Sequence, residues 1–143
     1  MAEIADRPGV EATVRDAYGL YVERIGREPA PMAADYGRLI AEGLVYVLEL
    51  DGDLAGLIVL VAGSDHLLVE NVAVAPAYQG RGLGRRLMAF AEREAGAAGL
   101  PEVRLYTNVA MTENLRFYPA LGYEETRRVV EGGFARVYFS KRL

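Results

Sequence analysis

The sequence contains no cysteine and only one histidine, His66. The absence of cysteine excludes disulfides, thiol nucleophiles and cysteine-ligated zinc. With one histidine and no cluster of carboxylate ligands, we expect no metal site. Long hydrophobic runs are also missing, since residues 54–63 fall far short of the roughly 20 residues that span a bilayer. No basic-then-apolar leader opens the chain, so we expect a cytoplasmic protein with no membrane partner.

The composition is that of a globular protein. The chain has 143 residues, of which 52% are hydrophobic and 25% are charged, so we expect a single domain over residues 1–143 that buries about two-thirds of its unfolded surface. The net charge of −4 argues against a nucleic-acid partner, despite local arginines. The same acidity mildly favours cationic ligands through electrostatic steering.

Apolar periodicity and turn residues predict alternating helices and strands in one mixed α/β (α+β) arrangement. Helices are expected at residues 10–26, 33–42, 83–98 and 112–121, and strands at 44–50, 54–62, 66–75, 102–107, 123–130 and 134–140. The strand at 102–107 follows the strand at 66–75 through a helix, so the two should be parallel through a right-handed crossover. Asp51-Gly52 and Gly132-Gly133 predict hairpin turns.

The stretch 70–86 predicts an anion-binding loop between a strand and a helix. Gly80, Gly82 and Gly84 alternate along it. Because glycine has no Cβ, the backbone there can take positive φ and approach a ligand closely. Several N–H groups then converge with the positive end of the following helix, which suits a phosphate or pyrophosphate. Arg81, Arg85 and Arg86 add positive charge at the rim.

Two well-known glycine loops do not fit this stretch. The dinucleotide fingerprint G-x-G-x-x-G would need glycine at Arg85 or at Leu87, and no Gly-Lys pair exists for a Walker A loop. The pattern that fits is Gln79-x-x-Gly82-x-Gly84, which resembles the Q/R-x-x-G-x-G/A pyrophosphate loop of the GNAT N-acetyltransferase superfamily. The alternative is a surface turn that uses glycine only for its geometry.

A second block strengthens this resemblance. Leu105-Tyr106-Thr107-Asn108 is followed by residues 113–123, Glu-Asn-Leu-Arg-Phe-Tyr-Pro-Ala-Leu-Gly-Tyr, which are similar to the family's E-N-x-x-x-x-Y-x-x-x-G-F/Y segment. The resemblance covers residues 10–143. It implies the GNAT fold, a mixed sheet of six to seven strands flanked by about four helices and splayed between the strand at 66–75 and the strand at 102–107.

The resemblance implies acetyl-CoA as cosubstrate. In the family its pantetheine arm pairs with the backbone of the first of the two splayed strands. The residues expected to bind the cofactor are Val72, Ala73, Val74, Gln79, Gly80, Arg81, Gly82, Leu83, Gly84, Arg85, Asn108, Asn114, Phe117 and Tyr118. For Asn108 and Asn114 the alternative role is hydrogen bonding to nearby backbone groups, which is common for asparagine near helix ends.

The resemblance also indicates catalytic roles. Tyr118 matches the family tyrosine beside the CoA sulfur, and its phenol stays protonated at neutral pH, so it is the candidate general acid. Its alternative role is aromatic packing, and Pro119 disfavours helical conformation at Tyr118 and puts its orientation in question. Glu70 is the candidate base that accepts the amine proton directly or through water, or else a solvated strand residue.

Two classes of function therefore stand side by side. The first is an acetyl-CoA-dependent N-acetyltransferase that acts on a primary amine, either a small molecule or a peptide. The second is a non-catalytic acyl-CoA sensor, for which Tyr118 would be dispensable. An unrelated nucleotide-binding domain is the third alternative. The exposed edges of such a sheet are compatible with a homodimer.

Overall fold

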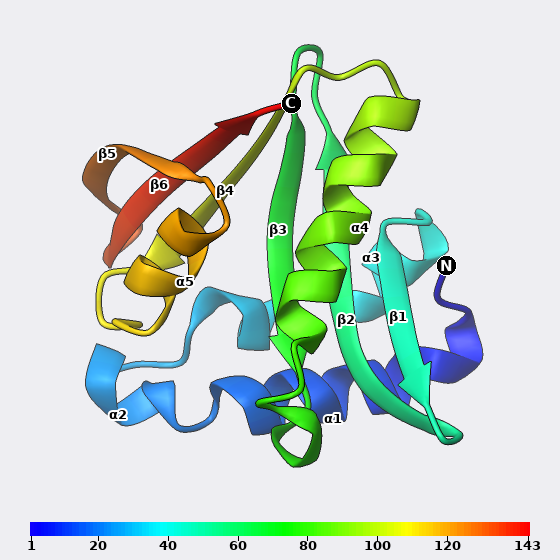
Figure 1. Cartoon of the computed structure of the whole chain (residues 1–143). Coiled ribbons are helices and arrows are strands. Elements are labelled where there is room, and N and C mark those ends of the chain that lie inside the picture. Colours follow the sequence, from blue (N-terminus) through cyan, green and yellow to red (C-terminus); the bar gives the residue numbers. More distant parts are fainter. The chain divides into compact units, whose positions relative to one another are not determined.

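The computed structural model describes residues 1–143 as a mixed sheet flanked by helices (Figure 1). Its 3-10 and α-helices are η1 (Ile4–Asp6), α1 (Arg7–Tyr18), α2 (Tyr21–Ile25), η2 (Ala30–Ala33), α3 (Tyr36–Ala41), η3 (Pro76–Tyr78), α4 (Leu83–Ala97) and α5 (Asn114–Ala120). The strands are β1 (Val45–Leu50), β2 (Asp53–Ala62), β3 (Leu67–Val74), β4 (Glu102–Asn108), β5 (Glu124–Glu131) and β6 (Phe134–Arg142). Hydrogen bonding links the six strands in the order β1-β2-β3-β4-β6-β5.

The residues divide into two compact units. The first contains Met1–Leu60 and Asn71–Ala89, and the second contains Val61–Glu70 and Phe90–Leu143. The chain passes from one unit to the other within β2, β3 and α4.

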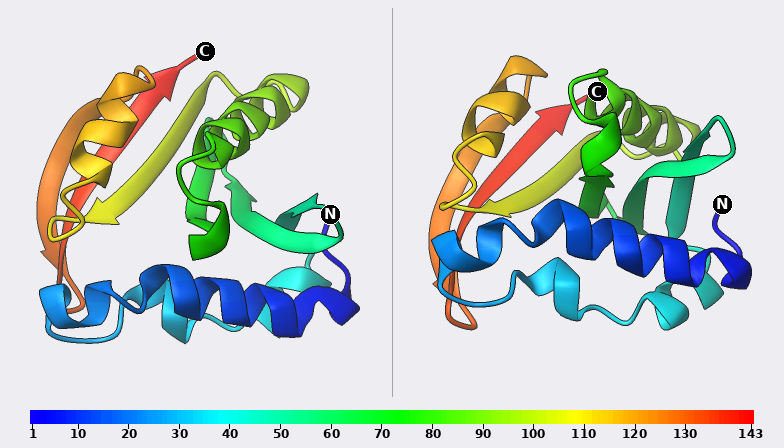
Figure 2. Two further views of the ribbon diagram at one scale, coloured as in Figure 1. Left: turned by 60° about the horizontal axis from the view of Figure 1, so that its bottom comes forward. Right: turned by 90° about the horizontal axis from the view of Figure 1, so that it is seen from below.

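The first unit packs helices against β1 and β2. Figure 2 shows α1 running alongside the segment that contains η2 and α3. Alternate residues of β2, Leu57 and Val59, join the core formed with these helices. The opposite face of β2 lies against α4 at Gly56, since a Cβ built on this residue would be 3.2 Å from Leu87 Cδ1. The strand therefore buries both faces, which explains why its sequence is apolar almost without interruption.

A buried asparagine ties the helices of the first unit to β3. Asn71 is 6% exposed. Its Oδ1 lies 2.5 Å from the Tyr18 hydroxyl of α1, and its Nδ2 donates to the Tyr36 hydroxyl of α3 at 2.9 Å. The Tyr36 hydroxyl in turn donates to the Pro31 carbonyl in η2. Because buried polar groups need partners, this network fixes the position of both helices on the strand.

The second unit is built on β4, β6, β5 and the start of β3. β3 pairs in parallel with β4 over Leu67–Val69 and Val103–Leu105, which confirms the predicted parallel crossover. β6 lies antiparallel between β4 and β5. α5 covers one face of these strands (Figure 1), where Val137 and Phe139 are buried.

Two of the predicted helices differ from the structure. The expected helix at 10–26 begins earlier and is divided into α1 and α2 by a turn at Gly19-Leu20. The expected helix at 33–42 is shorter, because η2 precedes it and Ala34 is extended at a φ of −70° and a ψ of 149°. In both places a turn interrupts the helix while the helical spacing of the apolar residues continues. The turn therefore cannot be predicted from that spacing. The structure has five α-helices where about four were expected.

The predicted hairpin turns are confirmed. Asp51 and Gly52 both have positive φ, 53° and 83°, as a type I′ turn requires, and Gly132 and Gly133 do the same between β5 and β6. The first five residues form no strand, and the Ala2 amide donates to the Val45 carbonyl at 2.7 Å.

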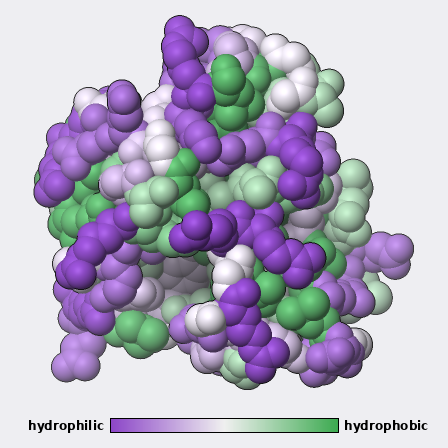
Figure 3. Space-filling model, viewed as in Figure 1, coloured by the Kyte–Doolittle hydropathy of each residue, from purple (hydrophilic) through white to green (hydrophobic).

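Most of the apolar residues are covered. Figure 3 shows hydrophilic residues interspersed with hydrophobic ones on the face it displays. The large hydrophobic side chains that stay exposed are Met1, Ile4, Leu20, Val130 and Leu143. None of the helices combines the length and the apolar character needed to cross a membrane.

Candidate functional site

The glycine loop of the first unit joins β3 to α4. After Val74 the chain forms η3, and Gly80 and Gly82 then take φ of +81° and +76° before α4 begins at Leu83. Gly84 lies inside the helix and has no positive φ. The expected set of three alternating glycines with left-handed backbone is therefore reduced to two, because helix formation starts one residue before Gly84.

The start of α4 presents backbone donors to open space. Its first helical hydrogen bond runs from the Arg86 amide to the Gly82 carbonyl, at 3.1 Å, so the N–H groups of residues 83–85 have no acceptor within the helix. A Cβ built on Gly80 or Gly82 would meet no atom within 4 Å. Converging donors, the helix dipole and free space together suit an anionic group of pyrophosphate type.

Side chains brace this loop. The Gln79 Nε2 donates to the Val74 carbonyl at 3.2 Å, across η3. The Tyr78 hydroxyl donates to Asp53 Oδ2 at 2.9 Å, and this hydrogen bond raises the pKa of Tyr78. The Arg81 guanidinium lies 5.2 Å from the centre of the Tyr78 ring. Arg81 thus packs on Tyr78, and Arg85, in the first turn of α4, is exposed.

Two backbone carbonyls of β3, just before the loop, already accept a hydrogen bond from a side chain. The Val72 carbonyl accepts from the Tyr18 hydroxyl at 2.8 Å, and the Val74 carbonyl accepts from Gln79. A carbonyl oxygen has two lone pairs, so each can accept a further hydrogen bond. The Ala73 side chain is buried in the core of the first unit. Ala73 therefore offers a ligand only its backbone, whereas the Val72 and Val74 side chains are half-buried.

Tyr118, in the second unit, is buried among aromatic rings. It is 5% exposed, and its ring centre lies 5.1 Å from that of Phe117, 6.1 Å from that of Tyr123 and 5.8 Å from that of Phe139. Burial raises the pKa of the Tyr118 phenol. The structure records no hydrogen bond between its hydroxyl and another protein group. The phenol is therefore protonated at neutral pH.

Pro119 does not displace Tyr118 from its helix. α5 runs from Asn114 to Ala120 with the proline inside it. The Tyr118 carbonyl accepts from the Leu121 and Tyr123 amides, at 3.0 and 3.1 Å. Because Pro119 is the second-last residue of α5, only the end of the helix loses a donor, and the residues before it stay helical.

Glu70 is paired with a tyrosine from the neighbouring strand. The Tyr106 hydroxyl donates to Glu70 Oε1 at 3.0 Å. Burial, followed by the charge of Glu70, raises the pKa of Tyr106 to about 12. Tyr106 therefore donates at any neutral pH and fixes one carboxylate oxygen of Glu70.

Both asparagines of the second block hold the connection from β4 to α5. Asn108 Oδ1 accepts from the Ala110 amide at 2.9 Å. Asn114 Nδ2 donates to Thr107 Oγ1 at 3.0 Å. Asn108 thus has the backbone-bonding role that was its alternative, whereas Asn114 bonds a side-chain hydroxyl and not a backbone group. Each side chain retains further hydrogen-bonding capacity.

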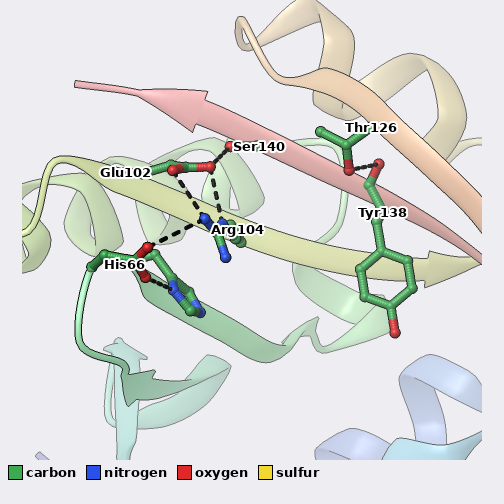
Figure 4. Close-up of polar contacts among 7 residues, drawn as sticks. His66, Glu102, Arg104, Thr126, Tyr138 and Ser140 are labelled. Carbon is green, nitrogen blue, oxygen red and sulfur yellow. Dashed lines mark hydrogen bonds and ion pairs between the residues drawn. The ribbon is translucent and has the colours of Figure 1, made fainter.

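A cavity of about 550 Å³ lies on the sheet face of the second unit (Figure 4). Two rows of paired residues cross this face. Arg104 is paired between Leu68 and Ser140, and Tyr138 between Tyr106 and Arg127. Arg104, Arg127 and Tyr138 were not among the site residues predicted from the sequence. The alternation of apolar and polar residues in 102–108 marked a polar face, but which strand stands beside which cannot be read from alternation.

His66 borders the cavity at the start of β3. Its carbonyl accepts from the Gly63 amide at 2.8 Å, and its Nδ1 lies 2.8 Å from Asp65 Oδ1. It therefore closes the turn that enters β3, as well as lining the cavity. Nowhere in the structure do three or more histidine, aspartate or glutamate side chains gather as metal ligands would.

Comparisons with known proteins agree on one family. The family model described as "Acetyltransferase (GNAT) domain" matches residues 41–125. Two curated relatives align over 58 residues, 41% of this chain. They are the N-alpha-acetyltransferase 80 of Mus musculus, 47% identical, and the aminoalkylphosphonate N-acetyltransferase of Salmonella typhimurium, 34% identical. The aligned part spans only 17% and 38% of their lengths.

A solved structure shows the same fold over the whole chain. The PaiA N-acetyltransferase of Thermoplasma acidophilum, in complex with coenzyme A, superposes with a TM-score of 0.83. The match covers 99% of this chain and 96% of that one, at 17% sequence identity.

Proposed function

This chain belongs to the GNAT acetyltransferase family, and we propose that it transfers the acetyl group of acetyl-CoA to a primary amine by direct attack. The observation that carries the proposal is the glycine loop at the start of α4, where open space faces unpaired backbone donors. The curated relatives, each named as an N-acetyltransferase, support the same reaction class.

The residues of the first unit suit the cofactor. The N–H groups of residues 83–85, with Gly80 and Gly82, would hold the pyrophosphate, and Arg81 and Arg85 would neutralise its charge. The backbone of Val72, Ala73 and Val74 would bind the pantetheine amides. When bound, acetyl-CoA supplies an acetyl group activated as a thioester. Holding the two reactants together accounts for much of the acceleration.

Two residues of the second unit suit the proton transfers. The Tyr118 hydroxyl would donate its proton to the departing thiolate, because its phenol is protonated and hydrogen-bonded to no protein group. Glu70 would accept the proton that the amine loses, directly or through water. Tyr106 occupies Glu70 Oε1, which leaves Oε2 for that proton. A positioned acid or base contributes roughly 10²–10⁴-fold in rate.

The proposal is tested by thiol release from acetyl-CoA with pooled amines, namely amino acids, polyamines, aminoglycosides and peptide N-termini. We expect release that depends on one pool and falls about 10²–10⁴-fold in Tyr118→Phe, because phenylalanine keeps the packing and removes the donor. Tyr123→Phe is the matched control. It removes a buried phenol that donates to Glu92 and should keep the rate.

The opposite result would separate binding from catalysis. Saturable acetyl-CoA binding without thiol release in any pool would favour the non-catalytic acyl-CoA sensor. An unchanged rate of release in Tyr118→Phe would remove Tyr118 from the mechanism. Failure to bind acetyl-CoA would contradict the proposal as a whole.

A further inference from the structure

The cavity of the second unit contains basic side chains whose hydrogen-bonding capacity is only partly used. Arg104 donates from Nε and Nη2 to Glu102, at 3.0 and 3.3 Å, and Nη2 lies 3.8 Å from Asp65. Its Nη1 has no partner in the structure. A guanidinium carries five N–H donors in a planar fork, so Arg104 can bind a further acceptor from inside the cavity.

Arg127 is the second basic group. Its guanidinium carbon lies 4.3 Å from the centre of the Tyr138 ring, and its one ion pair, with Glu131, is long at 4.0 Å. Stacking on the ring occupies the face of the guanidinium and leaves its edge, which carries the N–H groups, available for a planar acceptor. Arg127 faces the cavity because of a register shift between Glu125 and Arg127, which sets it opposite Tyr138.

The acidic groups around the cavity are already engaged. Glu102 accepts from Arg104 and from the Ser140 hydroxyl, and these hydrogen bonds lower its pKa to about 2. Asp65 lies beside His66 and Arg104 at the cavity's edge. The unused capacity is therefore that of donors, which suits a ligand with a carboxylate. Leu68, Tyr106 and Tyr138 provide an apolar and aromatic wall for its hydrocarbon part.

The cavity also lies next to the candidate base. Tyr106 lines the cavity and donates to Glu70. Arg104 is two residues from Tyr106 along β4, roughly 7 Å, and Arg127 is two strands away, roughly 10 Å. A ligand bridging Glu70 and these arginines would need its amine and its carboxylate separated by several bonds.

We propose that this cavity binds the carboxylate of an amine acceptor, so that the substrate class is a linear ω-amino acid or a lysine-like amine and not a short α-amino acid. This inference rests on the proposed acetyl transfer, because only that reaction makes the bound ligand an acetyl acceptor. The carboxylate is held by Arg104 and Arg127, and the amine lies toward Glu70. The local arginines select this group even though the whole chain carries a net charge of −4.

The single histidine makes a direct binding test possible. The imidazole C–H signals of His66 are the only ones in the proton NMR spectrum and report on the cavity that it lines. At constant pH, ε-aminocaproate should shift them saturably, and ε-aminocaproamide, which keeps the ammonium group but has no carboxylate, should not. Arg127→Gln should weaken the interaction about tenfold, because it removes a charged donor. Arg93→Gln, an exposed arginine on α4 outside the cavity, is the matched control.

Steady-state transfer distinguishes this inference from the proposed function. With saturating acetyl-CoA, ε-aminocaproate should have a lower KM than its amide, and Arg127→Gln should abolish that difference. Equal NMR shifts for acid and amide, no shift, or equal effects of Arg93→Gln and Arg127→Gln would overturn the carboxylate site. If acetyl transfer to the amide releases thiol as efficiently as transfer to the carboxylate, the carboxylate site is contradicted and the acetyltransferase activity is supported. A carboxylate-dependent shift without any release would support the site and contradict acetyl transfer.

Discussion

The three glycines of the loop differ in whether their backbone conformation requires glycine. Gly80 and Gly82 have φ near +80°, a conformation that costs an L-residue with a Cβ roughly 1–2 kcal/mol. Gly84 is helical, so its φ makes no such demand. The sequence motif contains all three, and only the backbone distinguishes those that need glycine for conformation.

A pair of glycine substitutions, one just before α4 and one inside it, tests this distinction. Gly82→Ala should lower the free energy of unfolding by about 1–2 kcal/mol, because φ there is +76°. Gly96→Ala should raise it by about 0.5–1 kcal/mol, since Gly96 is an exposed helical residue of α4 with no atom near its missing Cβ. Urea denaturation measures both. Equal changes in the two variants would contradict the conformational argument.

The elements of the first unit depend on Asn71 for their arrangement. It connects α1 and α3 to the strand that carries the backbone of Val72, Ala73 and Val74. The sequence placed this position only within the expected strand at 66–75. Its role could not be predicted, because both hydroxyls that meet it come from helices more than thirty residues earlier in the chain.

Removing the Asn71 side chain should destabilise the protein. Asn71→Ala is expected to cost about 1–3 kcal/mol, since it removes a hydrogen-bond partner from the hydroxyl of the buried Tyr36 and from that of the partly buried Tyr18. Tyr18→Phe, which keeps the ring and loses one of these contacts, should cost less. Guanidinium denaturation of both variants provides the comparison, and an Asn71→Ala variant as stable as the wild type would show that the network does not hold the helices.

The elements of the second unit show what register decides. Strands at 123–130 and 134–140 were predicted as a hairpin, and the structure confirms it. The shift between Glu125 and Arg127, however, decides which side chain of β5 stands opposite Tyr138. A bulge of this kind re-aims side chains, and it follows from twist and packing, so the polar face of β5 was not predictable.

At the scale of the whole molecule, acidic groups with depressed pKa values link stability to pH. Arg104, and then Ser140, lower the pKa of Glu102 from 4.5 to about 2. A depressed pKa contributes stability above the unfolded value, and this contribution is lost as the pH falls from about 4.5 toward 2.

The pH dependence can be measured with one substitution. Glu102→Gln should be less stable than the wild type at pH 7, and the difference should shrink below pH 4.5 and vanish near pH 2. Glu125→Gln, which breaks the exposed pair with Arg128, should have a much smaller effect because solvent screens that pair. Thermal unfolding between pH 2 and 7 measures both. A difference for Glu102→Gln that is independent of pH would rule out the charged pair as its cause.

The sequence by itself determined the family, the order of the elements and the residues of the glycine loop. These depend on local features, namely apolar period, turn glycines and two motifs about thirty residues apart. Only the tertiary structure decided which groups meet: Tyr106 with Glu70, Asn71 with two helices, and two arginines around one cavity. Those contacts depend on strand order, register and a bulge. They arise when segments distant in the sequence pack together, so no local pattern in the sequence predicts them.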